Sequence, residues 1–128
     1  MKFSIIVPTW NNLNYLKLCI KSIKKNSAYD HELVFHINEG ADGSLEYIQK
    51  EKYKYSYSKN NQGVCVAFNE AAKLAENNYI VLAHDDMYFC PGWDTVFCNE
   101  IKVHDHIQNF FLCSQYKVLN NLNYSKLV

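Results

Sequence analysis

The chain has 128 residues, of which 48% are hydrophobic and 20% are charged. This composition excludes a disordered segment and suits one globular domain over residues 1–128. Thirteen basic and thirteen acidic residues cancel, so no overall field draws the chain to nucleic acid or to an anionic membrane surface. Five cysteines without C-x-x-C spacing exclude a paired disulfide framework and a zinc site.

The location of the protein is predicted from what its apolar runs and cysteines allow. The first apolar run stops at Pro8 and is too short for a signal peptide, and no transmembrane segment of sufficient length follows. Free buried thiols suit a reducing compartment. We therefore expect a cytoplasmic protein, or one held at the cytoplasmic face of a membrane by further segments or partners.

The first half of the chain alternates predicted strands with predicted helices. Residues 2–10 read as a buried strand that stops at Pro8, and residues 31–38 as a second apolar strand. Between them, one helical face is formed by Leu16, Cys19, Ile20 and Ile23. The turn "EGADGS" follows, in which Ser44 is predicted to cap a short helix through Ile48.

The second half continues this alternation. Residues 53–58 alternate tyrosine with polar residues, which indicates a strand exposed on one side. Residues 79–83 contain almost no polar side chain, which predicts a central strand covered on both faces. Residues 109–118 suggest a last strand. Helical stripes precede and follow the central strand: Val64, Ala67, Phe68, Ala71, Leu74 and Ala75, then Trp93, Val96, Phe97 and Ile101.

This order predicts an α/β fold with a mainly parallel, Rossmann-like open sheet and flanking helices. Ligands of such sheets bind outside the carboxyl ends of the strands. Four polar segments follow the first four strands and should therefore meet at one rim: residues 8–12, 38–42, 60–63 and 84–86.

Asp85 and Asp86 are the sharpest feature of this rim. Neighbouring carboxylates repel each other unless a cation or hydrogen-bond donors offset their charge. Mg²⁺ or Mn²⁺ prefers such oxygen ligands and is usually held by one or two carboxylates, water and substrate phosphates. The alternative is that either aspartate caps a turn or faces water. His84 is either a group beside the metal or an ordinary hydrogen-bonded histidine.

Three further residues carry weaker signals. Gly63 precedes a helix whose free N–H groups can face a phosphate, although it forms no known phosphate-binding motif. Asn69 lies within that helix, where it either contacts a ligand or a loop or is simply exposed. Trp10 either stacks on a base or packs over the sheet edge.

Taken together, the segments "SIIVPTWNN", "ELVFHINEGADGS", "NNQGVCVAFNEAA" and "YIVLAHDDMYFCPGW" resemble the family 2 glycosyltransferases of the GT-A fold. They occur in the family's order and cover residues 3 to about 95. The resemblance implies a site for a nucleotide-diphosphate sugar, of the UDP or GDP type, with a divalent metal cofactor, Mn²⁺ or Mg²⁺.

The resemblance also implies roles for individual residues. Nucleotide-binding positions are Pro8, Thr9, Trp10, Asn11, Asn38, Glu39, Gly63, Asn69 and Asp85, and the metal-binding positions are Asp86 and Asp85. Asn38 stands where the family usually has an aspartate, so Glu39 is the better charged contact. Ala83 replaces the first acid of the frequent D-A-D-D form, which leaves the number of metal contacts open.

We therefore expect an inverting, metal-dependent glycosyltransferase that transfers a sugar to a hydroxyl of a glycan, lipid or protein acceptor. No counterpart of the family's acceptor-binding half is found before Val128, so the catalytic base is expected outside this chain. Two alternatives remain: a non-catalytic nucleotide-sugar-binding or protein-interaction domain of the same fold, and an unrelated doubly wound domain.

Overall fold

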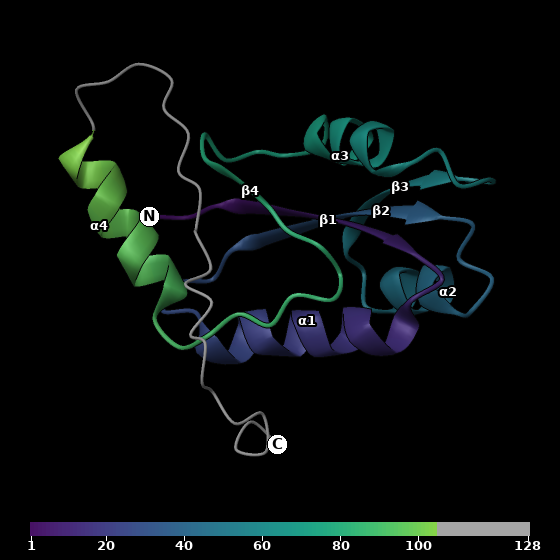
Figure 1. The fold of residues 1–128 in the computed structure, drawn as a ribbon, viewed down its shortest axis with the longest axis horizontal. Coiled ribbons are helices and arrows are strands. Elements are labelled where there is room, and N and C mark those ends of the chain that lie inside the picture. Colours follow the sequence, from purple (N-terminus) through teal and green to yellow (C-terminus); the bar gives the residue numbers. More distant parts are fainter. Residues whose placement is uncertain (105–128) are drawn as a thin grey trace, which may run out of the picture.

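The computed structural model describes residues 1–104, which form alternating strands and helices (Figure 1). The elements are β1 (Ser4–Trp10), α1 (Leu13–Asn26), β2 (Glu32–Asn38), α2 (Ser44–Lys50), β3 (Lys54–Ser58), α3 (Val64–Ala72), β4 (Ile80–Leu82) and α4 (Trp93–Val103). The strand predicted over residues 109–118 lies outside the described residues.

The described strands form one parallel sheet in the order β3-β2-β1-β4, which confirms the predicted parallel α/β architecture. β1 pairs with β2 from Ser4 opposite Glu32 to Trp10 opposite Asn38. The chain runs outward from β1 to β3 and returns to the other side of β1 with β4, so the order reverses beside β1. This is the switch point at which open α/β sheets bind ligands.

β1 continues through Pro8 to Trp10, and the prediction that it stops at Pro8 is wrong. Proline lacks the N–H that a central strand needs. Ile6 O accepts the Ala83 N–H on the β4 side at 3.0 Å, and residues two apart in a strand turn their backbone groups to the same side. The nitrogen of Pro8 therefore points past Leu82, the last residue of β4, where no donor is required.

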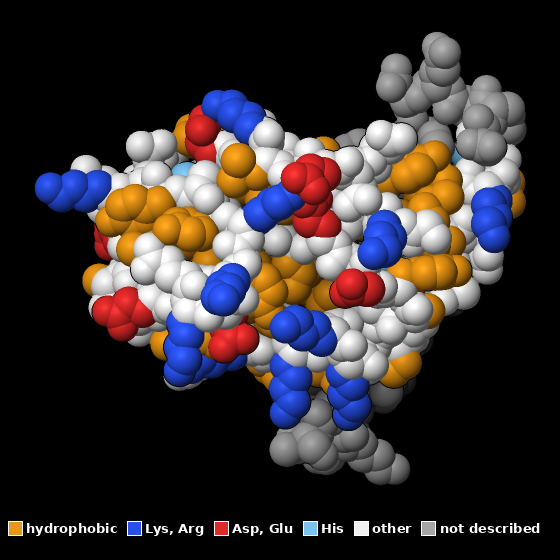
Figure 2. All heavy atoms as spheres, turned by 180° about the vertical axis from the view of Figure 1, so that it is seen from behind, with side chains coloured by type: hydrophobic (Ala, Val, Ile, Leu, Met, Phe, Trp, Pro, Cys, Tyr) orange, Lys and Arg blue, Asp and Glu red, His pale blue; other side chains and the backbone are white. Residues whose placement is uncertain are grey.

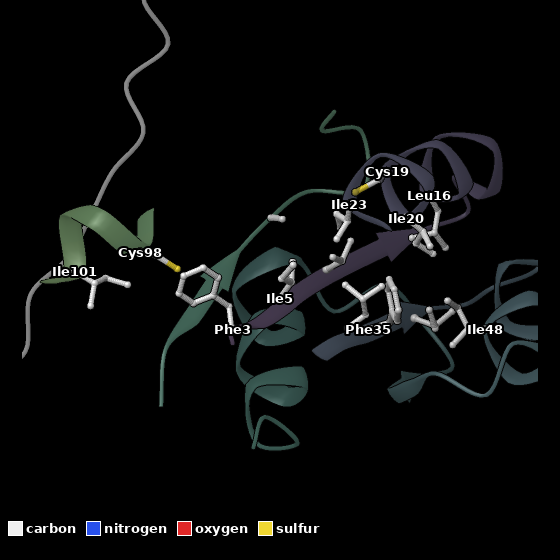
Figure 3. Packing of buried hydrophobic residues seen from close by; sticks show 14 residues of the cluster. Phe3, Ile5, Leu16, Cys19, Ile20, Ile23, Phe35, Ile48, Cys98 and Ile101 are labelled. Carbon is white, nitrogen blue, oxygen red and sulfur yellow. The ribbon is translucent and has the colours of Figure 1, made fainter. Parts of the chain in front are cut away.

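Helices cover both faces of the sheet, with α3 on one side and α1 and α2 on the other (Figure 1). The larger core lies between the sheet and α1, α2 and α4: Phe35 lies near Ile20 of α1 and Ile48 of α2, and Phe3 lies beside Cys98 of α4 (Figure 3). Leu16, Cys19, Ile20 and Ile23 are all buried there, which confirms the predicted helical stripe. The α3 side is thinner, with Ile6, Val34 and Ala71 at its centre.

β4 is the outermost strand of the described sheet, and its predicted burial on both faces is wrong for these residues. Ile80 and Leu82 are 47% and 49% exposed. They lie in register with Ser4 and Ile6, on the α3 face, while α3 packs chiefly against β1 and β2. Only Val81 turns into the larger core.

Two helix predictions need correction at their ends. α3 ends at Ala72, so Leu74 and Ala75 fall outside it, and Val64 is 47% exposed rather than buried. The N-cap of α2 is Gly43 with φ 92°, and Ser44 is already the first helical residue. The carboxylate of Asp42 accepts the Ser44 N–H at 3.0 Å. Asp42 therefore caps this helix in place of the serine.

The lysines that cluster along α1 are exposed: Lys17, Lys21, Lys24 and Lys25. Two of them also lie over aromatic rings, Lys17 at 5.0 Å from Tyr47 and Lys24 at 4.9 Å from Tyr53. Basic and acidic side chains are interspersed over the face shown in Figure 2.

The described cysteines are free: Cys19 and Cys98 are buried, whereas Cys65 and Cys90 are exposed. The expectation of mostly buried thiols therefore holds for two of them. Within residues 1–104, no helix has the length and apolar character needed to cross a lipid bilayer.

Candidate functional site

A cleft of about 360 Å³ lies at the carboxyl rim of the sheet. It is lined by Pro8, Thr9, Trp10, Asn11, Asn12, Asn38, Asn61, Gly63, Val64, His84 and Asp85. The four rim segments predicted from the sequence therefore converge. Among the predicted site residues, Glu39, Asn69 and Asp86 do not line the cleft, although each belongs to a segment that does.

The carboxylate of Asp85 is fixed at the β1–β4 side of the cleft. Asp85 Oδ2 accepts a hydrogen bond from the buried Thr9 hydroxyl at 2.6 Å. Below it, Cys19 Sγ of α1 lies 3.6 Å from the His84 carbonyl oxygen. Burial, together with the negative charges of Asp85 and Asp86, raises the pKa of Cys19 to about 12. Cys19 is therefore an un-ionised thiol near pH 7 and adds no charge to this part of the site.

The donor set at the end of β4 can be tested against a divalent cation. Residues 1–104 contain no group of three or more histidine, cysteine, aspartate or glutamate side chains arranged to hold a metal, so a cage made of protein ligands alone does not fit there. Asp85 faces the cleft and Asp86 is exposed beside it. One or two carboxylates completed by water and phosphate oxygens is the arrangement Mg²⁺ commonly adopts, and these residues fit it.

Asn11 joins the loop after β1 to the loop after β2. Its Nδ2 donates to Glu39 Oε2 at 3.0 Å, and its Oδ1 accepts the Ala41 N–H at 2.9 Å. Asn11 and Glu39 both have left-handed backbones, with φ of 47° and 61°, a conformation that asparagine tolerates better than most residues. Glu39 is thus hydrogen-bonded to a residue that lines the cleft without lining it itself.

Asn38 is buried, with 3% exposure, at the inner end of the cleft. Its Oδ1 accepts the Gln62 N–H at 3.0 Å and lies 2.7 Å from the donating Ser58 hydroxyl. The next polar residue inward, His36, contacts Ser56 at 2.8 Å. Burial lowers the pKa of His36, and its hydrogen bond to the Asn38 side chain acts in the opposite direction, so this network is predominantly neutral near pH 7.

Trp10 lies opposite Asn38 in the β1–β2 register, and the two side chains share one face of the sheet. The Trp10 side chain is 54% exposed while it lines the cleft. This exposure leaves the indole face available to a planar ligand and does not fit a side chain packed over the sheet edge.

Gly63 shapes the opposite wall. Its φ of 83° with ψ of 162° belongs to a region that only glycine adopts readily. Asn61 Oδ1 accepts the Gly63 N–H at 2.9 Å, and α3 begins at the next residue with its first N–H groups at the rim. Asn69, farther along α3, is exposed.

Asp42 is a supporting residue that the sequence reasoning placed in a turn without giving it a role. Its Oδ2 accepts the Leu13 N–H at 2.7 Å, at the start of α1. Because Oδ1 binds the first residue of α2, one carboxylate holds two helix starts behind the cleft. Partial burial would raise the pKa of Asp42, but these hydrogen bonds lower it below its usual value.

Several known proteins are similar to this chain in sequence and in fold. Residues 4–126 match the profile described as "Glycosyl transferase family 2". The chain is 27% identical over 96 residues to the poly(ribitol-phosphate) beta-glucosyltransferase of Bacillus spizizenii, covering 69% of this chain and 15% of that protein. S. aureus TarS, solved in complex with UDP-GlcNAc, superposes with a TM-score of 0.73 at 27% identity, over 82% of this chain and 32% of the other.

A more distant structure shows the fold alone. The mannosyltransferase PcManGT of Pyrobaculum calidifontis, in complex with GDP-Man and Mn²⁺, gives a TM-score of 0.64 at 20% identity, over 73% of this chain and 30% of the other. The chain thus spans about a third or less of the length of each of these three relatives. The predicted GT-A type fold is confirmed, and the chain belongs to glycosyl transferase family 2.

Proposed function

We propose that this chain carries the donor site of a metal-dependent, inverting glycosyltransferase that uses a nucleotide-diphosphate sugar. The observation that carries the proposal is the Thr9-bound carboxylate of Asp85, placed in a cleft at the switch point between β1 and β4. The UDP-GlcNAc complex of TarS supports a nucleotide sugar as the ligand. Family membership removes the alternative of an unrelated doubly wound domain.

The proposed roles follow the walls of the cleft. The loop after β1 binds the nucleoside, with Trp10 against the base and Asn11 tying the loop to Glu39. Gly63 brings the start of α3 to the diphosphate, whose charge suits free N–H groups. Asp85 and Asp86 hold Mn²⁺ or Mg²⁺, and Asn69 borders the nucleotide from α3. These roles extend the sequence-based assignments to the geometry of the cleft.

The proposed reaction is a direct displacement. An acceptor hydroxyl oxygen attacks the anomeric carbon, its proton passes to a base outside the described residues, and the bond from that carbon to the diphosphate breaks with inversion. A bound divalent ion supplies charge neutralisation of the departing diphosphate. The described residues are proposed to hold and orient the donor.

The described domain is assigned to donor binding, and acceptor selection is proposed to reside outside residues 1–104. The acceptor class is a glycan, lipid or protein hydroxyl, and the proposed location is the cytoplasm or the cytoplasmic face of a membrane. A protein-interaction domain of this family without donor binding is the competing outcome of the following test.

Thermal melting with UDP and with GDP, each with and without Mn²⁺, distinguishes the two. We expect a Mn²⁺-dependent rise in melting temperature with at least one nucleotide, because a ligand that binds only the folded state stabilises it. Asp86→Ala should abolish the Mn²⁺-dependent part. Absence of any rise with either nucleotide would favour the interaction domain.

A further inference from the structure

The connection between β4 and α4, residues 83–92, contains neither helix nor strand and runs along α1 toward α4 (Figure 1). It carries both proposed metal ligands. Asp85 and Asp86 are the central residues of a β-turn, which a hydrogen bond from the Met87 N–H to the His84 carbonyl oxygen closes at 3.2 Å. The direction of the two carboxylates therefore depends on what holds the two ends of this turn.

The sheet and α1 together hold the side on which the chain enters the turn. The Ala83 N–H donates to the Ile6 carbonyl oxygen of β1 at 3.0 Å. The Cys19 thiol of α1 lies 3.6 Å from the His84 carbonyl oxygen. Both contacts are made at or before the first residue of the turn, so the side on which the chain leaves it needs a support of its own.

Two side chains of α1 supply that support through Phe89. The Phe89 N–H donates to Ser22 Oγ at 3.0 Å, and the Phe89 carbonyl oxygen accepts from Asn26 Nδ2 at 2.6 Å. Ser22 and Asn26 lie one helical turn apart, so their side chains share one face of α1. The helix thus satisfies both backbone groups of Phe89, as a neighbouring strand would do in a sheet.

The chemistry of the groups fixes the direction of these hydrogen bonds. Ser22 is 2% exposed, and its hydroxyl proton is directed to the Cys19 carbonyl oxygen at 2.7 Å, which leaves a lone pair of Oγ for the Phe89 N–H. A carbonyl oxygen can only accept, so Asn26 must present its amide nitrogen to Phe89. Replacement of either side chain by alanine therefore leaves one backbone group of Phe89 without its partner.

We propose that Ser22 and Asn26 are positioning residues for the metal-binding turn, which act through Phe89 and contact neither the cation nor the nucleotide. This inference rests on the proposed function, because it requires a divalent ion at Asp85 and Asp86. Neither Ser22 nor Asn26 lines the cleft. Loss of either hydrogen bond lets the end of the turn move, so the carboxylates adopt the binding geometry for a smaller fraction of the time and the apparent affinity falls.

The test measures how much Mn²⁺ strengthens nucleotide binding, which we call the Mn²⁺ enhancement. Titrations of UDP and GDP with and without Mn²⁺ give this ratio for the wild type, Ser22→Ala and Asn26→Ala, with uridine and guanosine as ligands that lack the diphosphate. Loss of one such hydrogen bond should lower the enhancement about three- to tenfold and leave nucleoside affinity unchanged. The Phe89 amide should also exchange its hydrogen faster in both variants.

Ser27→Ala is the matched control. The Ser27 hydroxyl also donates to a carbonyl oxygen of α1, that of Ile23 at 2.7 Å, and accepts an N–H, here that of the Trp93 indole at 3.0 Å. The same substitution thus removes the same pair of hydrogen bonds, but at the start of α4 and beyond the turn. We expect a loss of melting temperature similar to that of Ser22→Ala and an unchanged Mn²⁺ enhancement.

Two further variants separate positioning from a general loss of stability. Ser22→Thr keeps the hydroxyl and should restore most of the enhancement. In the Asp86→Asn background, Asn26→Ala should lower the remaining enhancement no further, because both changes act on the same contact with the cation. Asn26 is only half-buried, so its variants keep the test available if the buried Ser22 position does not tolerate alanine.

A full Mn²⁺ enhancement in the folded alanine variants of Ser22 and Asn26 would overturn the assignment. So would an equal loss of enhancement in Ser27→Ala, because the effect would then follow stability rather than the turn. A wild-type chain that binds UDP and GDP equally with and without Mn²⁺ would contradict the metal site of the proposed function, and this assignment with it. That result is distinct, since it is seen before any variant is compared.

Discussion

Thr9 Oγ1 donates a hydrogen bond to Asp85 Oδ2 across 76 positions of sequence and joins the end of β1 to the segment after β4. Both residues line the cleft. The bond holds a carboxylate toward the ligand space at the one place where the strand order reverses. The orientation of Asp85 therefore depends on a hydroxyl at the end of the central strand.

Thr9→Val should weaken Mn²⁺-dependent nucleotide binding. Valine keeps the branched shape that the buried site accommodates but cannot donate to Asp85. Loss of one such bond should raise the dissociation constant of UDP or GDP about three- to tenfold, as measured by titration. Thr95→Val on the exposed face of α4 is the control, and equal affinities for the two variants would show that the Thr9 hydroxyl has no positioning role.

Trp10→Ala should reduce nucleotide affinity without destabilising the fold. A base stacked on an aromatic ring gains about 1–3 kcal/mol, so the dissociation constant should rise about 5- to 150-fold. Because the indole is largely exposed, the melting temperature should stay close to that of the wild type. Trp10→Phe should restore most of the affinity, whereas Tyr15→Ala, another exposed aromatic residue, should have no effect. Unchanged nucleotide affinity in Trp10→Ala would show that the base does not stack on Trp10.

Gly63→Ala should destabilise the fold more than Gly92→Ala. Neither added Cβ would meet another atom, so the difference isolates the backbone. Gly92 has φ 79° and ψ 7°, the left-handed region that alanine enters at about 1 kcal/mol. The ψ of 162° at Gly63 belongs to a region that costs alanine about 1–3 kcal/mol. Urea unfolding measures the loss of unfolding free energy in each variant. A larger loss for Gly92→Ala than for Gly63→Ala would contradict a strained backbone at Gly63.

Stability should fall as the pH drops below about 6.5, partly through His31. Its Nδ1 accepts the Phe3 N–H at 3.2 Å while Nε2 donates to Asp94 at 3.0 Å, so the folded state holds the neutral ring. Burial lowers the pKa of His31 more than Asp94 raises it. The unfolded chain therefore binds a proton first as the pH falls below the ordinary value of 6.5, and the stabilisation present above that value is lost.

Asp94 also makes the protein less stable as the pH falls, but its effect lies at a lower pH than that of His31. Burial would raise the pKa of Asp94, yet hydrogen bonds from His31, Tyr29 and Ala28 lower it, so its contribution is present above the usual aspartate range and is lost in stronger acid. His31→Gln, whose amide imitates the neutral ring, should flatten the unfolding free energy between pH 7.5 and 5.5, leaving only the share of His36. An identical slope in both proteins would exclude His31.

The sequence predicts the parts of the fold that depend on local pattern. The apolar stripe of α1 and the apolar runs of β1 and β2 are long enough to predict a helix and two strands. Because parallel strands end at the same edge of a sheet, the segments that follow them are predicted to meet there. For this reason the sequence alone predicts that Thr9, Asn38 and Asp85 meet at one rim, and the structure places all three in one cleft.

Features that depend on a partner far away in sequence could not be predicted in this way. Proline normally ends a strand, and Pro8 continues one only because β4 is short. β4 is apolar enough for a central strand, but the position of α3 leaves Ile80 and Leu82 open among the described residues. The cap of α2 comes from Asp42, whose carboxylate also serves α1, a link that no local motif reveals.

The most direct test of the account compares UDP with uridine by titration in the presence and absence of Mn²⁺. If Asp85 and Asp86 grip a divalent ion that carries the diphosphate, Mn²⁺ should strengthen UDP binding by about tenfold or more and leave uridine binding unchanged. Asp86→Asn should remove most of that difference. Equal effects of Mn²⁺ on UDP and uridine, or a full Mn²⁺ effect in the variant, would contradict the account.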